Sequence, residues 1–239
     1  MCLSALNDDI VACRLCARLV DWRESIARAK RAAFRHEDYW GRPITGFGDA
    51  KARVLVCGLA PAAHGGNRTG RIFTGDRSGD WLYAALYQAS FANQPHSTHR
   101  GDGLRLRDCF ITAAVRCAPP ANKPSPAELA NCLPYLQEEL RLLRRVRVIV
   151  CLGGFAWSAV LRVLRTGLTV PSPKPTFGHS SEASIGPYQL LGCYHPSQQN
   201  TFTGRLTRAM LNSVFRRARA LAGLKPSARR DRSIRAAQP

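Results

Sequence analysis

The chain has 239 residues, which suits one globular domain with a sizeable core, and no apolar run approaches the ~20 residues that a membrane-spanning helix needs. Its 35 Lys and Arg against 16 Asp and Glu give a formal net charge of +19. A strongly positive surface attracts polyanions, so nucleic acid is the expected partner. A GC-rich genome would explain the choice of Arg over Lys but not the shortage of acids. The N-terminus lacks the pattern of a secretory signal, so we expect a cytoplasmic protein.

Apolar strands and helical patterns alternate along the chain after an N-terminal helical region. We expect buried strands at residues 53–61, 108–117, 147–154 and 188–197. Helices are expected at residues 80–91, 125–143, 155–164 and 203–223. The second of these helices opens with Ser125, Pro126 and Glu128, a capping-box pattern with proline at the first helical position. A loop rich in Pro, Ser and Gly covers residues 167–186.

This alternation predicts an α/β fold of parallel βαβ units, with helices on both faces of the sheet. In such sheets ligands bind beyond the carboxyl ends of the strands. That rule selects the loop after the first strand and the segments RCAPPANKP, GGFAW and HPSQQN. We assign residues 1–224 to a single domain and expect the basic tail, residues 225–239, to be disordered.

Nine cysteines are many for a chain expected in a reducing compartment, so binding of a metal or a cluster is the hypothesis to test. Cys13 and Cys16 form a CxxC pair that can bind one centre, and Cys117 and Cys132 lie farther along the chain. Four thiolates suit either a tetrahedral zinc ion or a four-iron cluster, and the spacing does not separate the two. The cysteines within apolar strands are expected to be small buried hydrophobes: Cys57, Cys109, Cys151 and Cys193.

The loop after the first strand, GLAPAAHGGNRTGRIFTGD at residues 58–76, is rich in glycine but lacks a phosphate-binding spacing. It contains neither GxxxxGK[ST] nor GxGxxG. Small side chains and proline dominate the loop, so we expect its backbone groups to contact a ligand that lies flat. Phe73 can supply an aromatic face, and Asp76 is the only carboxylate of the loop.

A second candidate group follows the fourth strand. His195 precedes Pro196, which keeps the histidine in an extended or turn conformation. A histidine at the carboxyl end of a strand can donate a hydrogen bond to a carbonyl oxygen or carry a proton near neutral pH. A histidine bonded only to the backbone of its loop is equally compatible with the sequence.

Together these segments resemble the uracil-DNA glycosylase superfamily, and in particular its family 5, the iron–sulfur branch. The resemblance is carried by residues 58–76, by AVRCAPPANKPSPAELANC at 114–132 and by HPSQQNTFTGR at 195–205, with CRLC at 13–16. The segments follow the family's order and span most of the chain. The resemblance implies an α/β fold built as a three-layer α/β/α sandwich, with a short, mainly parallel four-stranded central sheet.

The resemblance also implies a [4Fe-4S] cluster with a structural role, held by Cys13, Cys16, Cys117 and Cys132. The implied activity is that of a monofunctional DNA glycosylase. Such an enzyme flips out and hydrolytically excises uracil, and other deaminated bases such as hypoxanthine, from double-stranded DNA and so initiates base excision repair. We expect it to act as a monomer.

The same resemblance assigns roles to individual residues. Asp76 would orient the attacking water and stabilise the positive sugar, and His195 would stabilise negative charge on the departing base. The base pocket is assigned to Gly58, Ala60, Ala63, Phe73, Asn122 and His195. Contacts to DNA are assigned to Gln198, Gln199, Asn200 and Arg205.

Two positions depart from other branches of the superfamily. Leu59 and Ala60 stand where other branches have a polar residue that helps to activate water. Ala113 and Ala114 stand where several branches have an asparagine that recognises uracil. Both departures agree with family 5, shift the catalytic burden to Asp76 and predict looser base selectivity.

Two other functions share part of this pattern. A non-enzymatic iron–sulfur or zinc DNA-binding regulator would have the same cysteines and charge but would need neither Asp76 nor His195. A nucleotide or phosphate hydrolase could use the same fold, although acids for a divalent metal are few near the strand ends.

Overall fold

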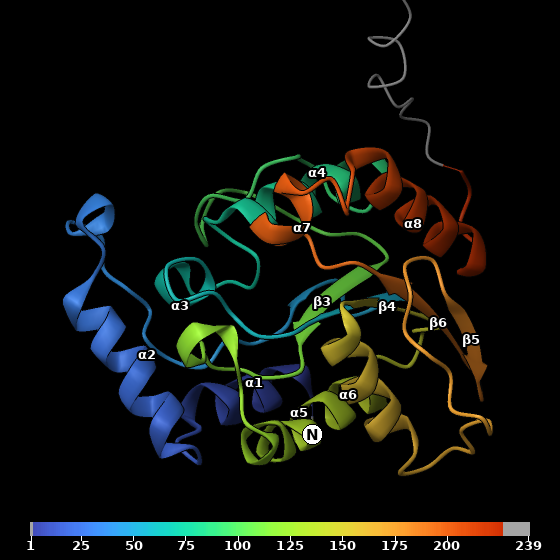
Figure 1. The fold of residues 1–239 in the computed structure, drawn as a ribbon, viewed down its shortest axis with the longest axis horizontal. Coiled ribbons are helices and arrows are strands. Elements are labelled where there is room, and N and C mark those ends of the chain that lie inside the picture. Colours follow the sequence, from blue (N-terminus) through green and yellow to red (C-terminus); the bar gives the residue numbers. More distant parts are fainter. Residues whose placement is uncertain (1, 227–239) are drawn as a thin grey trace, which may run out of the picture.

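A computed structural model of the chain describes residues 2–226. All but the first two residues of the tail expected to be disordered therefore lie outside the described part. A six-stranded sheet with strand order β1-β3-β2-β4-β6-β5 forms the centre of the molecule (Figure 1). Its inner strands are mutually parallel: β3 (Cys109–Ala113), β2 (Val54–Gly58), β4 (Val148–Leu152) and β6 (Tyr188–Cys193).

The predicted α/β fold with four parallel strands is therefore confirmed, and the sheet has two further strands at its edges. β1 (Phe47–Gly48) pairs antiparallel with β3, and β5 (Glu182–Ile185) pairs antiparallel with β6. Both are short and partly exposed, so neither carries the apolar run that marks a buried strand. β5 lies within the segment 167–186, which was expected to be loop throughout.

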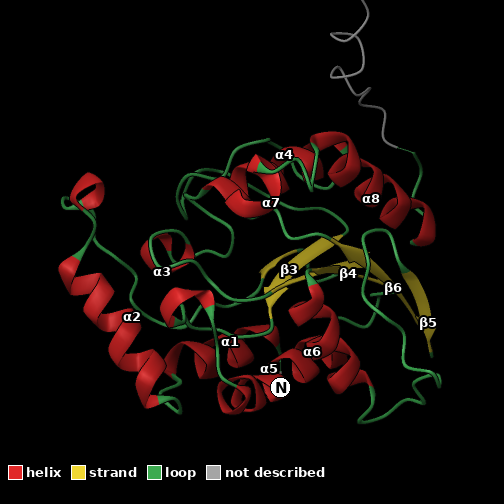
Figure 2. Cartoon of the chain, in the orientation of Figure 1, coloured by secondary structure: helices red, strands yellow, loops and turns green. Residues whose placement is uncertain are grey.

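Helices cover both faces of the sheet (Figure 2). One layer contains α4 (Arg77–Gln88) and α8 (Arg208–Leu221), and the other contains α5 (Pro126–Leu142) and α6 (Gly154–Leu164), with α1 (Leu3–Ala12) packed on α5. Strand β2 shows how the sequence produces this arrangement. Val54 and Val56 face the α4–α8 layer, whereas Leu55 and Cys57 face the α5–α6 layer, and all four are fully buried.

The capping box predicted for α5 is present and also attaches the N-terminal region. The Ser125 hydroxyl accepts a hydrogen bond from the Glu128 amide, and the Glu128 carboxylate accepts one from the Ser125 amide. The same carboxylate receives two hydrogen bonds of 2.7 Å from Arg18 of α2 (Ala17–Ala29). The N-terminal segment is thereby held against α5.

Three short helical segments lie near the carboxyl ends of the inner strands or follow them. They are α3 (Gly66–Thr69), the 3-10 turn η2 (Pro120–Asn122) and α7 (Gln198–Phe202); a further 3-10 turn, η1 (Ala32–Phe34), follows α2. None of them was predicted from the sequence, because each is too short to show helical periodicity. No helix among residues 2–226 is both long and apolar enough to cross a membrane.

Candidate active site

The carboxyl end of β2 and the aromatic ring of Phe73 form the floor of the site. A Cβ atom on Gly58, the last residue of β2, would lie 2.8 Å from two carbons of the Phe73 ring, so only glycine allows this close packing. Phe73 itself has a φ of +52°, a conformation that folds its side chain back over the strand end at a cost in backbone strain. The residue is 6% exposed.

Asp76 lies at the N-terminus of α4 and points toward the glycine-rich part of the loop. One carboxylate oxygen accepts a 2.9 Å hydrogen bond from the Gly79 amide, which caps the helix. The other oxygen lies against Gly65, where a Cβ atom would overlap it. Burial raises the pKa of Asp76, and the hydrogen bonds from Gly79 and Ser78 oppose that rise. The result is a fixed and partly desolvated carboxylate.

Arg68 holds this loop in shape, a role that was not anticipated from the sequence. Its guanidinium donates hydrogen bonds to the carbonyl oxygens of His64 (2.8 Å) and Gly75 (2.9 Å), and it forms an ion pair with Glu37. The side chain is 7% exposed. The available signal was weak, because Arg68 is one of two arginines among the small residues of the loop and is easily taken for a surface charge.

His195 follows β6 and faces Phe73, with the two ring centroids 5.8 Å apart. The Asn200 side-chain amide donates a 2.8 Å hydrogen bond to the His195 carbonyl and fixes the backbone at this point. Within residues 2–226, no hydrogen bond uses the ring nitrogens of His195, so the ring is not bonded to the backbone of its loop. Burial lowers the pKa of His195 to about 4, which keeps the imidazole neutral near pH 7.

The backbone of the loop is divided between structural bonds and groups that are open to a ligand. The carbonyl oxygen of Gly58 accepts from the Ala114 amide, and that of Leu59 accepts from the Val115 amide, both at 3.0 Å. Among the described residues, no hydrogen bond involves the peptide groups of Ala60 or Ala63. These two residues therefore offer the free backbone groups that the sequence led us to expect here.

Comparison with known proteins places this arrangement in a family. Residues 45–219 match the family model of the uracil DNA glycosylase superfamily. The chain belongs to the uracil-DNA glycosylase superfamily.

Relatives within the superfamily distinguish its branches. The chain is 56% identical to a type-5 uracil-DNA glycosylase of Mycobacterium tuberculosis over 92% of this chain and 82% of the relative. It is 53% identical to a type-5 uracil-DNA glycosylase of Thermus thermophilus over 92% of this chain and 98% of the relative. A type-4 uracil-DNA glycosylase of Pyrobaculum aerophilum is 30% identical over 66% of this chain and 74% of the relative. The expected family 5, and with it the enzyme class of DNA glycosylases, is confirmed.

The remaining residues assigned to the glycosylase site lie on exposed segments after β3 and β6. Asn122 is exposed in η2 with a φ of +56°, and its contact with a base stays a prediction. Gln198 and Gln199 are exposed on α7, and the Arg205 guanidinium lies 4.6 Å from the centre of the Tyr194 ring. Asn200 is engaged with the His195 carbonyl, so the structure gives it a positioning role beside the DNA contact assigned from the sequence.

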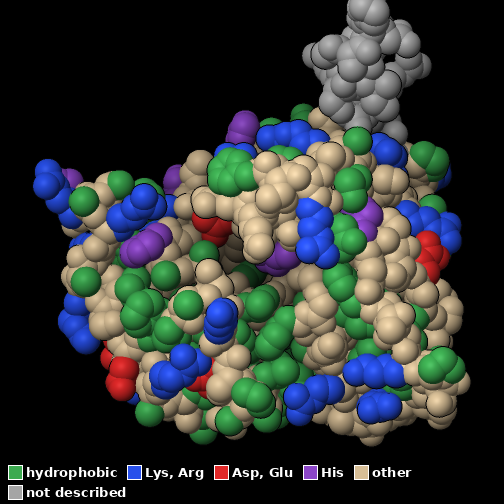
Figure 3. All heavy atoms as spheres, in the orientation of Figure 1, with side chains coloured by type: hydrophobic (Ala, Val, Ile, Leu, Met, Phe, Trp, Pro, Cys, Tyr) green, Lys and Arg blue, Asp and Glu red, His purple; other side chains and the backbone are tan. Residues whose placement is uncertain are grey.

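An exposed aromatic side chain of this segment was missed. Phe202, at the end of α7, is 67% exposed, and the Arg77 guanidinium lies 4.2 Å from the centre of its ring. Figure 3 shows that the molecular face is hollowed between α3 and α7, with histidine side chains at its border. The sequence signal for Phe202 was its position as the one aromatic residue in the polar stretch QQNTFTGR.

The four cysteines assigned to a cluster line one small cavity. Cys13 and Cys16 reach it from the segment between α1 and α2, Cys117 follows β3, and Cys132 lies on α5. Among residues 2–226, no three His, Cys, Asp or Glu side chains are grouped closely enough to hold a metal ion. The thiols surround the cavity instead of meeting at a point.

Two side-chain donors point at the sulfur atoms. Arg23 donates a 2.9 Å hydrogen bond to the Cys117 sulfur, and the Asn131 amide donates one of 3.3 Å to the Cys16 sulfur. Arg23 is 2% exposed, its Nε has no partner among the described residues, and the nearest carboxylate, that of Glu24, is 3.8 Å away. A buried guanidinium requires negative charge close by, and thiolates that bind an iron–sulfur cluster would supply it. The residues present therefore fit such a cluster.

Proposed function

We propose that this protein is a monofunctional DNA glycosylase that hydrolyses the bond between uracil and deoxyribose in DNA. The observation that carries the proposal is the position of Asp76. Its carboxylate is fixed next to Gly65 by the Gly79 amide, three residues along the loop from Phe73, whose ring faces His195. Glycosidic hydrolysis needs a carboxylate near the sugar, because the sugar gains positive charge as the bond to the base lengthens.

Asp76 acts on the sugar side of the reaction. The target nucleotide is first flipped out of the helix, since the bond cannot be reached in stacked DNA. The carboxylate then accepts a hydrogen bond from a water molecule, which attacks C1′ of the deoxyribose. As the bond between C1′ and the base breaks, its electron pair leaves with the base, and the proton of the water passes to the carboxylate. Partial desolvation strengthens the interaction of Asp76 with the positive sugar.

His195 acts on the base side. Its imidazole is neutral near pH 7 because burial lowers its pKa to about 4, so it can donate one hydrogen bond without carrying a positive charge. A donor placed at a carbonyl oxygen of the departing base stabilises the negative charge that develops there. The hydrogen bond from Asn200 to the His195 backbone sets the position of this donor.

The composition of the pocket supports a broad choice of base. The free polar groups near β2 include the peptide groups of Ala60 and Ala63. No side-chain amide accompanies them at the neighbouring strand, because Ala113 ends β3 and Ala114 follows it. Backbone groups can pair with uracil and with hypoxanthine, since both present a carbonyl next to an N–H group. We therefore include hypoxanthine among the substrates, and the product in each case is an abasic site, which starts base excision repair in the cytoplasm.

The exposed end of α7 suits contact with double-stranded DNA. Phe202 is an exposed apolar side chain. The Arg77 guanidinium lies over its ring, and Arg205 follows it three residues later in the chain. Apolar wedges flanked by arginines commonly open a base step while the arginines bind phosphates. We assign Phe202 to the insertion and expect Gln198 and Gln199 to contact the strands, with one monomer per site.

We further propose that Cys13, Cys16, Cys117 and Cys132 hold a [4Fe-4S] cluster. The cluster would supply no chemistry to the base; it would join the N-terminal segment to β3 and α5. The shared cavity and the hydrogen bonds from Arg23 and Asn131 to sulfur support this assignment.

A single-turnover assay tests the activity. Enzyme in excess is mixed with duplexes that carry uracil or hypoxanthine at one position, and abasic sites are measured by alkaline cleavage; the same duplex with thymine is the control. Release of uracil by the wild-type protein supports the proposal. Tight binding to every duplex without release of any base would instead indicate the DNA-binding regulator.

A further inference from the structure

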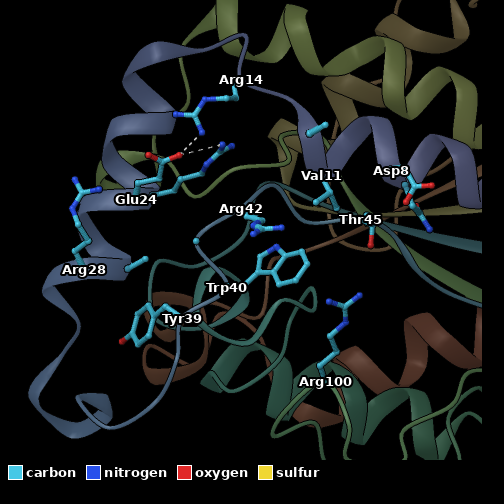
Figure 4. A pocket seen from close by; sticks show the side chains of 15 residues that line it. Asp8, Val11, Arg14, Glu24, Arg28, Tyr39, Trp40, Arg42, Thr45 and Arg100 are labelled. Atoms are coloured by element: carbon cyan, nitrogen blue, oxygen red, sulfur yellow. Dashed lines mark hydrogen bonds and ion pairs between the residues drawn. The ribbon is translucent and has the colours of Figure 1, made fainter.

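A second concave site lies beside α3. It is a groove of about 870 Å³ between α1 and α2 on one side and residues 39–45 with Arg100 on the other (Figure 4). Trp40 and Gly41 form its floor, and their amides donate hydrogen bonds to the carbonyl oxygens of Arg68 and Asn67 in α3. The groove is therefore built against the outer side of the active-site loop.

Two guanidinium groups in the groove are held by an aromatic ring and not by acids. Those of Arg42 and Arg100 lie 5.6 Å and 4.7 Å from the centre of the Trp40 ring. Among residues 2–226, neither side chain has a carboxylate within 4 Å, and both are exposed. Stacking fixes the orientation of a guanidinium while leaving its N–H groups free for an anion.

The supports of these residues show that the arrangement is fixed. The Trp40 indole donates a 3.1 Å hydrogen bond to the Pro43 carbonyl. The loop that carries Arg100 is anchored by a buried ion pair of 2.6 Å between Arg71 and Asp102, and Arg71 also donates to the Arg100 carbonyl. Both guanidinium groups are thus presented from anchored backbone.

The charge of the groove favours a chain of phosphates over a single small anion. Arginines line it on several sides, and Figure 4 shows Arg14 and Arg28 on the α2 side, with Arg42 and Arg100 beside Trp40. Two acids also line the groove, Asp8 and Glu24, and Glu24 is already paired with Arg14 at 2.6 Å. Five arginines against two acids leave the lining positively charged. A mononucleotide presents its phosphates at one end, whereas a strand presents them in series.

We propose that this groove binds a single strand of DNA through its phosphates, as an extension of the substrate beyond the active site. The inference rests on the proposed function, because it assumes that the strand belongs to the DNA under repair. Tyr39, which lines the groove, is hydrogen-bonded at 3.0 Å to His64 of the active-site loop. Only the single turn of α3 therefore separates the active-site loop from the groove, so a DNA strand that leaves the active site can continue into the groove.

The test uses the full-length protein and a fluorescent, uracil-free oligothymidylate, whose binding does not depend on base excision. R42Q/R100Q should bind it about tenfold more weakly than wild type, and the slope of log K against log salt should fall by about 1.4, for two lost phosphate contacts to a single strand. The matched control is R162Q/R165Q, which removes two exposed charges from the α6 side of the molecule. Thermal midpoints should be equal in all three proteins.

A second measurement ties the groove to the substrate. A single-stranded extension on a short uracil-containing duplex should tighten binding by wild type but not by R42Q/R100Q, with equal single-turnover release of uracil at saturating DNA. Equal affinity of R42Q/R100Q and wild type for the oligothymidylate would overturn the inference. Displacement of the oligothymidylate by inorganic pyrophosphate at equal phosphate concentration would overturn it too, because the groove would then hold an isolated anion. If the wild-type protein binds the oligothymidylate but releases no uracil from DNA, the proposed function is wrong, whereas binding of a strand in the groove is still supported.

Discussion

Replacing Asp76 by asparagine should separate its chemical role from its structural role. Asparagine can still accept the hydrogen bond from the Gly79 amide, so the cap of α4 is kept, whereas the negative charge is lost. In the proposed mechanism Asp76 activates water and stabilises the sugar, so the loss of its charge should slow uracil release by a factor on the order of 10² to 10⁴. That range corresponds to about 3 to 5 kcal/mol of transition-state stabilisation.

Asp76→Asn should lose activity but gain or keep stability. Burial raises the pKa of Asp76, so the folded protein binds its proton more tightly than the unfolded chain does, and the ionised carboxylate destabilises the fold at neutral pH. Asp76→Asn removes this penalty and should be at least as stable as wild type. Asp76→Ala also loses the helix cap, about 1 kcal/mol, and should melt about 2 to 4 °C below Asp76→Asn.

The assay is single-turnover release of uracil with enzyme in excess, together with thermal melting and DNA affinity at neutral pH. Asp80→Asn is the matched control. It neutralises an exposed acid in the first turn of the same helix and should release uracil at the wild-type rate. Gly65→Ala keeps the carboxylate but displaces it, so it should also lose activity. Release by Asp76→Asn within about threefold of wild type would refute the role of Asp76, since general acid–base groups contribute far more than that.

Four further predictions concern the other groups. Between pH 5.5 and 8, the rate of uracil release should show no step near pH 6.5, because burial holds the pKa of His195 near 4; a step in that range that vanishes in His195→Ala would contradict this placement. Burial alone would raise the pKa of Asp102, but hydrogen bonds from Arg71, Leu104 and Thr98 lower it to about 2, so its stabilisation is complete above about pH 4 and is lost as the pH falls toward 2. Asp102→Asn should therefore cost about 2 kcal/mol in urea unfolding at pH 7 and much less at pH 2.5; an equal cost at both would rule out this ion pair as the source. Phe202→Ala should slow release from duplex DNA by about tenfold while leaving release from single strands unchanged, since only a duplex must be opened; equal losses on both would exclude an insertion role. Purified protein should contain about four irons and four sulfides per chain, and Cys117→Ser should lower both the iron content and the thermal midpoint; stoichiometric zinc in the wild-type protein would contradict the cluster.

The inner sheet could be predicted from the sequence because its physical signal is strong. Strands such as β2 and β4 are buried on both faces, and a short uninterrupted apolar run is typical of a central parallel strand. β5 was missed since an exposed edge strand with the sequence EASI gains its stability from pairing with β6, which no local pattern reveals. Helix α7 was missed for a related reason, because its five residues are held by the Ser197 cap and by the contact of Phe202 with Arg77.

At the site, the sequence identified groups whose chemistry is rare in their setting, such as the lone acid Asp76 and the histidine before Pro196. It did not identify residues whose role depends on a partner far along the chain. Arg71 acts through Asp102, 31 residues away, and Arg23 acts through Cys117, 94 residues away. An arginine in a sequence with 35 basic residues carries no mark that separates a buried support from a surface charge.

The contact between Arg23 and Asn67 affects where this protein can be shortened. The Asn67 side-chain amide donates a 3.1 Å hydrogen bond to the Arg23 carbonyl, and Asn67 is 1% exposed within the active-site loop. The family match begins at residue 45, so a truncation made at that boundary would delete α1, α2 and this acceptor. It would remove the partner of the Asn67 amide and expose to water a side chain that is 1% exposed in the intact fold, in the loop that also holds Gly65. We therefore expect the smallest active version of this enzyme to keep its first two helices, although the family match at residues 45–219 does not include them.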